Sequence, residues 1–339
     1  MTTNMLIRDV IEKYTRILSD KSPTPKLDVE VLLCHVLEFD DRIKLMLRYS
    51  DEMSDLDLNK FENLFNMRMD KKPIAYIINK KEFMGYDFYV NENVLIPRPD
   101  TEIIVEETIS ILNSIIDSMS DKSNSICDSD SVNDGLVCDS EYKKNGSICD
   151  SNPVNDGLVC DPNLIFVDMC TGSGAIAIST AKYCKDVSKV NFFAVDVSKP
   201  ALDVSKKNAS DLGVDFINFV ESDLFSNDVF CNLEAKVDII VSNPPYIEDD
   251  VIATLEDDVK DYEPILALSG GSDGMYFYNK IISESRKYLK KDGFLIFESG
   301  HDQSNKISSE MKRCGFDDIY TIKDLQGFNR AVIGKYPRR

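Results

Sequence analysis

The first 80 residues carry their hydrophobic side chains three or four positions apart, the spacing that predicts amphipathic helices. The pattern predicts helices over residues 7–18, 28–37 and 57–69. Prolines lie between the first two helices and after the third, where they end the helical pattern. Residues 1–80 are therefore predicted to form a small, all-helical N-terminal domain.

The pattern changes over residues 83–96, where tyrosine, phenylalanine and valine flank Asn91-Glu92-Asn93. This predicts two strands with a turn at the Asn-Glu-Asn segment. Pro97-Arg98-Pro99 follows, and it stiffens the chain because each proline fixes its own φ and restricts the residue before it. We therefore expect residues 81–99 to be a β-hairpin linker between two domains.

The remaining chain, residues 100–339, alternates short apolar runs with helical patterns, which predicts an α/β domain with a mostly parallel sheet. The predicted strands cover residues 164–169, 191–195, 217–220, 238–242, 294–298 and 330–335. The predicted helices cover residues 102–117, 175–184, 199–212, 275–290 and 303–313.

A tandem duplication interrupts this alternation at residues 120–162. The 15-residue segment SICDSDSVNDGLVCD recurs 22 positions later with 13 identities. The segment is too polar and too short to bury a core, so we expect a disordered insert. Its four cysteines form no C-x-x-C pair and its aspartates lack the full calcium-loop pattern. We therefore expect no metal site.

The 339 residues carry 39 basic and 59 acidic side chains, a net charge of −20. This charge argues against a nucleic-acid binder, although a local basic stripe would still permit one. No apolar run approaches the length of a membrane span, and the N-terminus does not resemble a signal peptide. The nine cysteines are an odd number, which favours reduced thiols and hence a cytoplasmic protein.

A candidate cofactor site begins at Asp168–Gly174, DMCTGSG, where a predicted strand gives way to a predicted helix. Glycines in such a turn let the backbone approach a ligand, and the helix N-terminus offers free N–H groups. Asp196 ends the next predicted strand, and a carboxylate there can accept both hydroxyl protons of a ribose. Together these features favour a cofactor that contains adenosine over a set of ordinary turn residues.

A second motif, Asn243-Pro244-Pro245-Tyr246, follows another apolar strand and suits methyl transfer to a planar nitrogen. The Asn243 side-chain oxygen and the Pro244 carbonyl can accept the hydrogens of an NH₂ group and direct its nitrogen at a methyl sulfonium. The prolines fix this geometry, and Tyr246 offers a face for the flat group. No strong base is needed if the proton leaves after transfer, so orientation and preorganised dipoles would supply the catalysis.

These motifs resemble those of S-adenosylmethionine-dependent amino-methyltransferases, which include enzymes that methylate DNA adenine or ribosomal guanine. A narrower resemblance, from about residue 5 to the C-terminus without the insert, is to the protein-glutamine N5-methyltransferases of peptide chain release factors, the HemK/PrmC family. The segments that carry it are LDVEVLLCHVL (27–37), KKPIAYI (71–77), VLIPRPDTE (94–102), EPILALSGGSDG (263–274) and DLQGFNRAVIGK (324–335).

The resemblance implies a Rossmann-like, seven-stranded methyltransferase domain with S-adenosyl-L-methionine as cofactor. It also implies methylation of the glutamine in the Gly-Gly-Gln motif of class I release factors. The cofactor residues by this resemblance are Asp168, Cys170, Thr171, Gly172, Ser173, Gly174, Asp196, Asp223, Leu224 and Asn243. The substrate residues are Asn243, Pro244, Pro245, Tyr246 and Arg98, of which Asn243, Pro244 and Tyr246 are the catalytic set.

Three points stay open within this resemblance. Cys170 stands where the family often has glycine, so its side chain must fit close to the cofactor. Leu224 stands where some members carry an aromatic residue, which leaves stacking on the adenine open. Arg98 is a candidate to contact the cofactor, the substrate or an acidic neighbour.

Two other functions remain to be separated from the leading one. A DNA-adenine or ribosomal RNA-guanine amino-methyltransferase would share the motifs, but the acidic charge and the lack of a basic reading segment count against it. A non-catalytic adaptor could bind release factors through residues 1–80, but the intact Asn-Pro-Pro-Tyr motif counts against that. We expect a monomer whose helical domain recognises the release factor, with no stable nucleic-acid or membrane partner.

Overall fold

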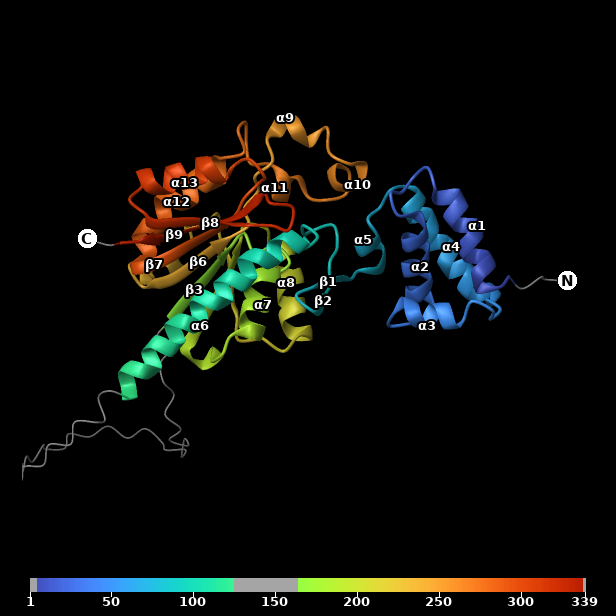
Figure 1. Ribbon diagram of the computed structural model, residues 1–339, viewed down its shortest axis with the longest axis horizontal. Helices are drawn as coiled ribbons and strands as arrows, with labels where there is room; N and C mark the ends of the chain where they lie inside the picture. The colour runs from blue at the N-terminus through green and yellow to red at the C-terminus, as the bar shows by residue number, and fades with distance from the viewer. Residues whose placement is uncertain (1–4, 125–163, 338–339) are drawn as a thin grey trace, which may run out of the picture.

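The computed structural model describes residues 5–124 and 164–337 (Figure 1). The N-terminal part is a cluster of helices: α1 (Ile7–Leu18), α2 (Pro25–Val36), α3 (Arg42–Leu47), α4 (Asp55–Met69) and α5 (Ile74–Ile78). The three helices that the periodicity predicts are confirmed as α1, α2 and α4. The sequence pattern misses α3 and α5 because they have six and five residues, too few for a helical period to show.

The helical domain has a core of its own. The ring of Tyr14 meets Phe61 and Phe65 edge-on at centroid distances of 5.0 and 4.8 Å. Beside this core, the Arg68 Nε donates to the Asp28 Oδ2 at 2.7 Å, and both side chains are buried. A buried charge is tolerated only when it is paired, so this ion pair depends on both partners.

The linker contains a hairpin, but its turn is not where the sequence pattern puts it. Strands β1 (Lys81–Phe83) and β2 (Tyr86–Phe88) pair in antiparallel fashion around Met84 and Gly85, which have φ of 52° and 75°. Two consecutive positive φ values make the tight turn that suits a hairpin. The predicted turn at residues 91–93 does exist, held by the Asn91 side chain and carbonyl, but it joins no strands.

The second part of the chain forms the predicted α/β domain around one seven-stranded sheet. The strand order is β5 (Asn218–Glu221), β4 (Val190–Asp196), β3 (Leu164–Met169), β6 (Val237–Ser242), β7 (Leu289–Glu298), β9 (Asn329–Tyr336) and β8 (Asp317–Lys323). The first five run parallel, and β9 is antiparallel to both of its neighbours. The Rossmann-like, seven-stranded expectation is therefore confirmed.

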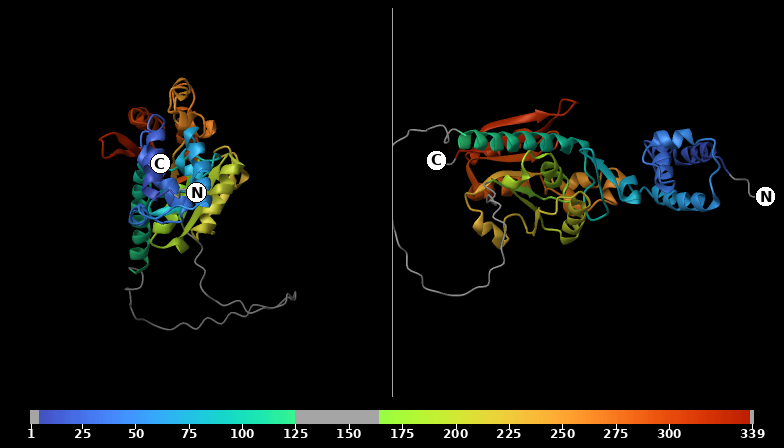
Figure 2. Two further views of the ribbon diagram at one scale, coloured as in Figure 1. Left: turned by 90° about the vertical axis from the view of Figure 1, so that its right-hand side faces the viewer. Right: turned by 90° about the horizontal axis from the view of Figure 1, so that it is seen from below.

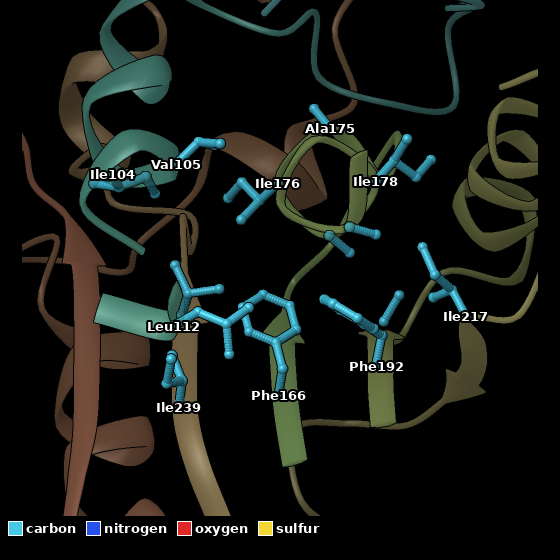
Figure 3. Close-up of a cluster of buried hydrophobic side chains, with 14 of the residues drawn as sticks. Ile104, Val105, Leu112, Phe166, Ala175, Ile176, Ile178, Phe192, Ile217 and Ile239 are labelled. Atoms are coloured by element: carbon cyan, nitrogen blue, oxygen red, sulfur yellow. The ribbon is translucent and has the colours of Figure 1, made fainter. Parts of the chain in front are cut away.

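Helices cover both faces of the sheet, because alternate side chains of each central strand point to opposite sides. Phe166 of β3 belongs to the core under α6 (Glu102–Asn124) and α7 (Ala175–Tyr183), which Figure 3 shows in close-up. Its neighbour Val167 belongs to the opposite core, under α12 (Tyr276–Tyr288) and α13 (Ser304–Arg313). The remaining elements are α8 (Lys199–Asp211), the short helices α9 (Asp249–Ile252), α10 (Asp257–Lys260) and α11 (Ile265–Leu268), and the 3₁₀ turns η1 (Pro99–Thr101), η2 (Val187–Lys189) and η3 (Asp228–Asn232).

The helical domain projects from one end of the α/β domain, as the right-hand view of Figure 2 shows. Tyr76 of α5 and Val94 of the linker pack with Val204 of α8 in a small separate core. Across the junction, Lys71 pairs with Asp257 of α10, and the Tyr262 hydroxyl donates to the Asp70 carbonyl at 2.6 Å. These polar contacts tie the helical domain to the segment that carries α9, α10 and α11.

Some expectations about boundaries need correction. Helix α6 continues to Asn124, so residues 120–124 are helical and are not part of a disordered insert. Helix α12 ends at Tyr288, where β7 begins directly. The duplicated segment, its four cysteines and the predicted disorder lie outside the described residues. Within the described ranges, no helix is long and apolar enough to cross a membrane, and no group of three metal-ligating side chains occurs.

Candidate functional site

A cavity of about 990 Å³, its open mouth included, lies at the carboxyl ends of β3, β4 and β6. Strand β3 is the point where the sheet order reverses, since β4 lies on one side of it and β6 on the other. Ligands of open parallel sheets bind at such a reversal. The linker contributes the segment from Asn93 to Arg98 to the lining, and the loop around α11 contributes Pro264, Leu266 and Ala267.

The turn after β3 has the tight backbone that its glycines predict. Gly174 has a φ of 82°, and a Cβ on it would lie 2.3 Å from the Ser205 hydroxyl oxygen, so only glycine fits. Cys170 also has a positive φ, 63°, a conformation that glycine adopts without strain. Burial raises the pKa of the Cys170 thiol, which keeps it neutral at pH 7.

Asp168 supports this turn from beneath and does not line the cavity. Its Oδ2 accepts hydrogen bonds from the Thr171 hydroxyl at 2.6 Å and from the Ala177 amide at 3.1 Å. Burial raises the pKa of Asp168 to about 7, and the two donors oppose that rise. Gly174 is likewise absent from the lining, whereas Cys170, Thr171, Gly172 and Ser173 line the cavity.

Asp196, at the end of β4, lies in the cavity wall. Its Oδ2 accepts from the Gly172 amide and its Oδ1 from the Ser198 amide, each at 2.9 Å. Burial raises the pKa of this carboxyl, and the backbone donors oppose the rise. The Val197 amide is a third backbone donor to this carboxylate, which has about four lone-pair sites, so it can still accept a hydroxyl proton from a ligand.

The predicted adenine residues, Asp223 and Leu224, also line the cavity. Leu224 is buried and has a φ of 50°, and its carbonyl accepts from the Ser222 hydroxyl at 2.6 Å. Phe277 of α12 lines the same cavity. Phe277 was not predicted, because an aromatic residue in the first turn of a helix gives no sign of facing a ligand.

The Asn243–Tyr246 motif divides between the cavity and the core behind it. Asn243 and Pro245 line the cavity, whereas Pro244 and Tyr246 do not. The Tyr246 carbonyl accepts from the Gln303 Nε2 at 2.8 Å. A Cβ on Gly270 would lie 2.6 Å from the Tyr246 Cα, so this backbone is closely packed as well as hydrogen-bonded.

The side chain of Asn243 is oriented by a contact that the sequence gives no reason to expect. Its Nδ2 lies 3.4 Å from the Thr101 hydroxyl oxygen and donates to it, and Thr101 also lines the cavity. The Tyr246 hydroxyl donates to the Glu298 Oε1 at 3.4 Å, and burial raises the pKa of that phenol. The Tyr246 hydroxyl is therefore neutral at pH 7, and Tyr246 does not line the cavity. The predicted contact between its ring and a flat substrate group stays a prediction.

Arg98 was predicted to contact the cofactor, the substrate or an acidic neighbour. In the structure its ion-pair partner is an acidic neighbour, Glu263. The Glu263 side chain is buried, and its Oε2 also accepts from the Ile96 amide at 3.4 Å. Burial raises the pKa of Glu263, while Arg98 opposes that rise. Arg98 itself remains half-exposed and lines the cavity, so it joins the linker to the loop before α11 at the mouth of the site.

Comparison with known proteins places this geometry in a family. Residues 9–78 match the family described as the PrmC N-terminal domain, and residues 161–259 match the methyltransferase small domain. The release factor glutamine methyltransferase of Clostridium acetobutylicum is 38% identical over 331 residues, which are 97% of this chain and 98% of the relative. The chain belongs to the release factor glutamine methyltransferase family.

Other members of this family extend the same comparison. The release factor glutamine methyltransferase of Clostridium botulinum is 32% identical over 97% of this chain and 98% of its own length. The solved structure of a release factor-specific protein-(glutamine-N5) methyltransferase from Alicyclobacillus acidocaldarius has 22% identity and a TM-score of 0.35, covering 74% of this chain and all of the other. At that score it adds nothing to the assignment. The predicted family and enzyme class are confirmed by the full-length relatives.

For a release factor glutamine methyltransferase, the site contains two residues that the motifs did not flag as functional. Thr101 lies in the VLIPRPDTE segment and is predicted only as a cap of the helix that follows. Glu298 ends a predicted strand near the edge of the sheet where ligands bind, with a structural role at least as well supported as a functional one. The fold brings the carboxyl ends of β6 and β7 beside the start of α6, so that Thr101 contacts Asn243 and Glu298 contacts Tyr246. The remaining predicted residues gather around one cavity or directly beneath it.

Proposed function

We propose that this chain transfers the methyl group of S-adenosyl-L-methionine to the side-chain amide nitrogen, N5, of the glutamine in the Gly-Gly-Gln motif of class I release factors. The observation that carries this proposal is Asn243 in the cavity wall, with its Nδ2 engaged by Thr101 and its Oδ1 left for a substrate amide. The full-length similarity to release factor glutamine methyltransferases supports the choice of substrate.

The cavity offers groups that fit each part of the cofactor. Backbone at Cys170–Ser173 can approach the methionine part closely, the Asp196 carboxylate suits the ribose hydroxyls, and Asp223 and Leu224 suit the adenine. Phe277 adds an aromatic wall. When bound, S-adenosyl-L-methionine supplies an electrophilic methyl group on a sulfonium.

The residues of the chain would act mainly by orientation. An amide nitrogen is a weak nucleophile because its lone pair is delocalised into the carbonyl. The Asn243 Oδ1, in the cavity wall, would accept one of its hydrogens and aim the nitrogen at the methyl group. Pro244 does not line the cavity, so a role of its main-chain carbonyl as the second acceptor requires the substrate to reach behind Asn243. Orientation of this kind contributes up to about 7–11 kcal/mol when alignment is ideal. Fixed acceptors that need no reorganisation add an electrostatic contribution.

The partner and the setting follow from this proposal. The substrate is a protein, so we propose that the helical domain, residues 1–80, helps to recognise it, with residues 81–99 as the linker and 100–339 as the methyltransferase domain. Release factors act on the ribosome, which places the proposed reaction in the cytoplasm. We further propose that the enzyme works as a monomer without stable nucleic-acid or membrane partners.

The test is transfer of radiolabel from S-adenosyl-L-methionine to a purified class I release factor by the full chain. We expect labelling that is lost when the glutamine of the Gly-Gly-Gln motif is replaced by alanine. Labelling that survives this replacement would contradict the substrate assignment. Labelling of DNA or ribosomal RNA without labelling of release factor would favour the nucleic-acid alternative, and absence of cofactor binding in calorimetry would favour the adaptor.

A further inference from the structure

Two segments that are distant in the sequence line the cavity and are joined by one buried carboxylate. The linker segment from Asn93 to Arg98 contributes to the lining, and so does the segment around α11. Glu263 lies between them: its Oε1 pairs with the Arg98 guanidinium, and its Oε2 accepts from the Ile96 amide at 3.4 Å. The Glu263 side chain is only 1% exposed, so water does not compete well for its oxygens. One carboxylate therefore holds both the linker backbone and the Arg98 side chain.

Arg98 is the one basic side chain among the described residues that line the cavity. Its side chain is 40% exposed, and its Nη2 donates to the Glu263 Oε1. Within the described part of the chain, its guanidinium makes no other hydrogen bond. A guanidinium carries five N–H donors in a planar fork, so donors remain for a ligand in the cavity.

The position of Arg98 along the chain places it close to the proposed acceptor of the substrate amide. The Thr101 amide donates to the Arg98 carbonyl at 3.0 Å and closes the turn η1. The Thr101 hydroxyl in turn accepts from the Asn243 Nδ2 at 3.4 Å. Arg98 is thus one turn away from the residue that contacts Asn243, and it lies at the more exposed end of this line.

The substrate motif needs a donor of this kind. Glycine has no side chain, so the two glycines of a Gly-Gly-Gln segment offer an enzyme only main-chain groups, apart from the space that they leave free. Main-chain carbonyl oxygens accept hydrogen bonds and cannot donate them. The charged, planar fork of an arginine is a strong donor for such oxygens.

We propose that Arg98 donates hydrogen bonds to the main-chain carbonyls of the Gly-Gly pair in the release factor, and that Glu263 is the positioning residue that holds the Arg98 fork for this contact. The inference rests on the proposed function, because it takes the glutamine amide to lie at Asn243. Without Glu263, the long Arg98 side chain has to be ordered when the substrate binds, which weakens binding and leaves the chemical step unchanged.

The first experiment measures steady-state kinetics of Arg98→Met with a purified, full-length class I release factor. We expect KM for the release factor to rise by about 10- to 100-fold, the range for hydrogen bonds from a charged group. The kcat and the dissociation constant for S-adenosyl-L-methionine stay close to wild type, because the contact is the same in the ground state and the transition state. An unchanged KM would overturn the inference. A loss of cofactor affinity as large as the rise in KM would also overturn it, because Arg98 would then bind the cofactor carboxylate.

The role of Glu263 is tested by Glu263→Gln alone and combined with Arg98→Met. We expect the single variant to raise KM by about 3- to 10-fold, as for loss of a typical hydrogen bond, with kcat unchanged. Because Glu263 acts through Arg98, the KM of the double variant should equal that of Arg98→Met within about twofold. The double variant also leaves no buried charge unpaired, so it keeps the inference testable if Arg98→Met does not fold. A wild-type KM for Glu263→Gln, or fully additive effects, would overturn the positioning role.

A matched control is Arg313→Met, which breaks another Arg–Glu pair, with Glu310, on α13 outside the cavity lining. Its KM for the release factor should equal that of wild type. Failure of the proposed function is distinguishable from failure of this inference. If the wild type binds the cofactor but leaves the release factor unlabelled, the proposed function fails and the inference fails with it. If the wild type labels the release factor and Arg98→Met has the same KM, only the inference is contradicted.

Discussion

The helical domain and the methyltransferase domain differ in where their polar side chains are placed. In the helical domain the Arg68–Asp28 pair is buried in the fold, while α3 exposes Ile43, Met46 and Leu47 by 68%, 56% and 80%. In the methyltransferase domain several buried polar side chains, among them Thr101, Thr171 and Ser222, line one cavity, to which no described residue of the helical domain contributes. The contrast teaches that the buried ion pair of the helical domain maintains structure, whereas these polar groups of the methyltransferase domain are available to a ligand. Substitutions should therefore separate stability from turnover.

The largest expected effect is on the stability of the helical domain. Asp28→Ala removes the 2.7 Å partner of the buried Arg68 guanidinium and leaves it only Asp258, whose Oδ2 lies 4.0 Å from the Arg68 Nη1. Breaking a buried pair in this way costs about 3–5 kcal/mol of unfolding free energy, measured by urea denaturation of the full chain. Asp9→Ala, which removes an exposed partner of Arg8, is the control and should leave the transition unchanged. If Asp28→Ala also lost a similar amount of binding free energy for the cofactor, the stability of the helical domain and the function of the methyltransferase domain would not be independent.

Next in size is the effect of removing the proposed amide acceptor. Asn243→Ala should lower kcat by about 10²–10³-fold, which corresponds to about 2.7–4 kcal/mol, as for loss of a preorganised polar contact in other enzymes. The dissociation constant for S-adenosyl-L-methionine, measured by calorimetry, should change by less than about twofold. Asn305→Ala, at an exposed position of α13 that does not line the cavity, is the matched control, and its kcat should equal that of wild type. Weak cofactor binding in Asn243→Ala would show that Asn243 serves the cofactor and not the substrate.

A smaller effect is expected at Asp196. Asp196→Asn replaces a carboxylate oxygen with an NH₂ group that faces the amide donors of Gly172 or Ser198. Hydrogen bonds to a charged group are worth about 1.5–3 kcal/mol, so cofactor affinity should fall at least about tenfold in calorimetry. Asp203→Asn, on the exposed side of α8, serves as the control. Equal cofactor affinities for the two variants would contradict the assignment of Asp196 as a cofactor-binding residue.

The smallest effect is expected at the junction between the domains. Lys71 and Asp257 are both more than one-third exposed, so water and salt screen their attraction. Lys71→Ala should change kcat and cofactor affinity by less than about twofold at physiological ionic strength. A larger change, seen in steady-state kinetics with release factor as substrate, would mean that the position of the helical domain controls the chemistry.

The sequence predicts the parts of this molecule whose signals are local. The turn after β3 and the Asn243–Tyr246 motif were predicted because strand, glycine or proline, and helix follow one another directly. Strand β8 was missed because most of its side chains are exposed, so no apolar run marks it. The hairpin was misplaced because its strands have three residues each, too few to show an alternation.

The support of the site could not be predicted in the same way. Asn243 and Thr101 are 142 positions apart, and Tyr246 and Glu298 are 52 apart. No periodicity or spacing brings such residues together; only the strand order does, by placing β6 beside β7 and both near the start of α6. The identity of a motif is thus readable from its own residues, whereas the groups that orient it depend on the complete fold.

Helix α6 ends and strand β3 begins at the end of the sheet opposite the cavity, which lies at the carboxyl ends of the strands (Figure 1). Strand β3 has six residues, so about 20 Å of rigid backbone separates its first residue from the turn that begins the site. Extra chain can accumulate at such a junction without altering the catalytic geometry. The same junction is therefore a natural insertion point for a fluorescent reporter or an affinity tag in an enzyme that must keep turning over.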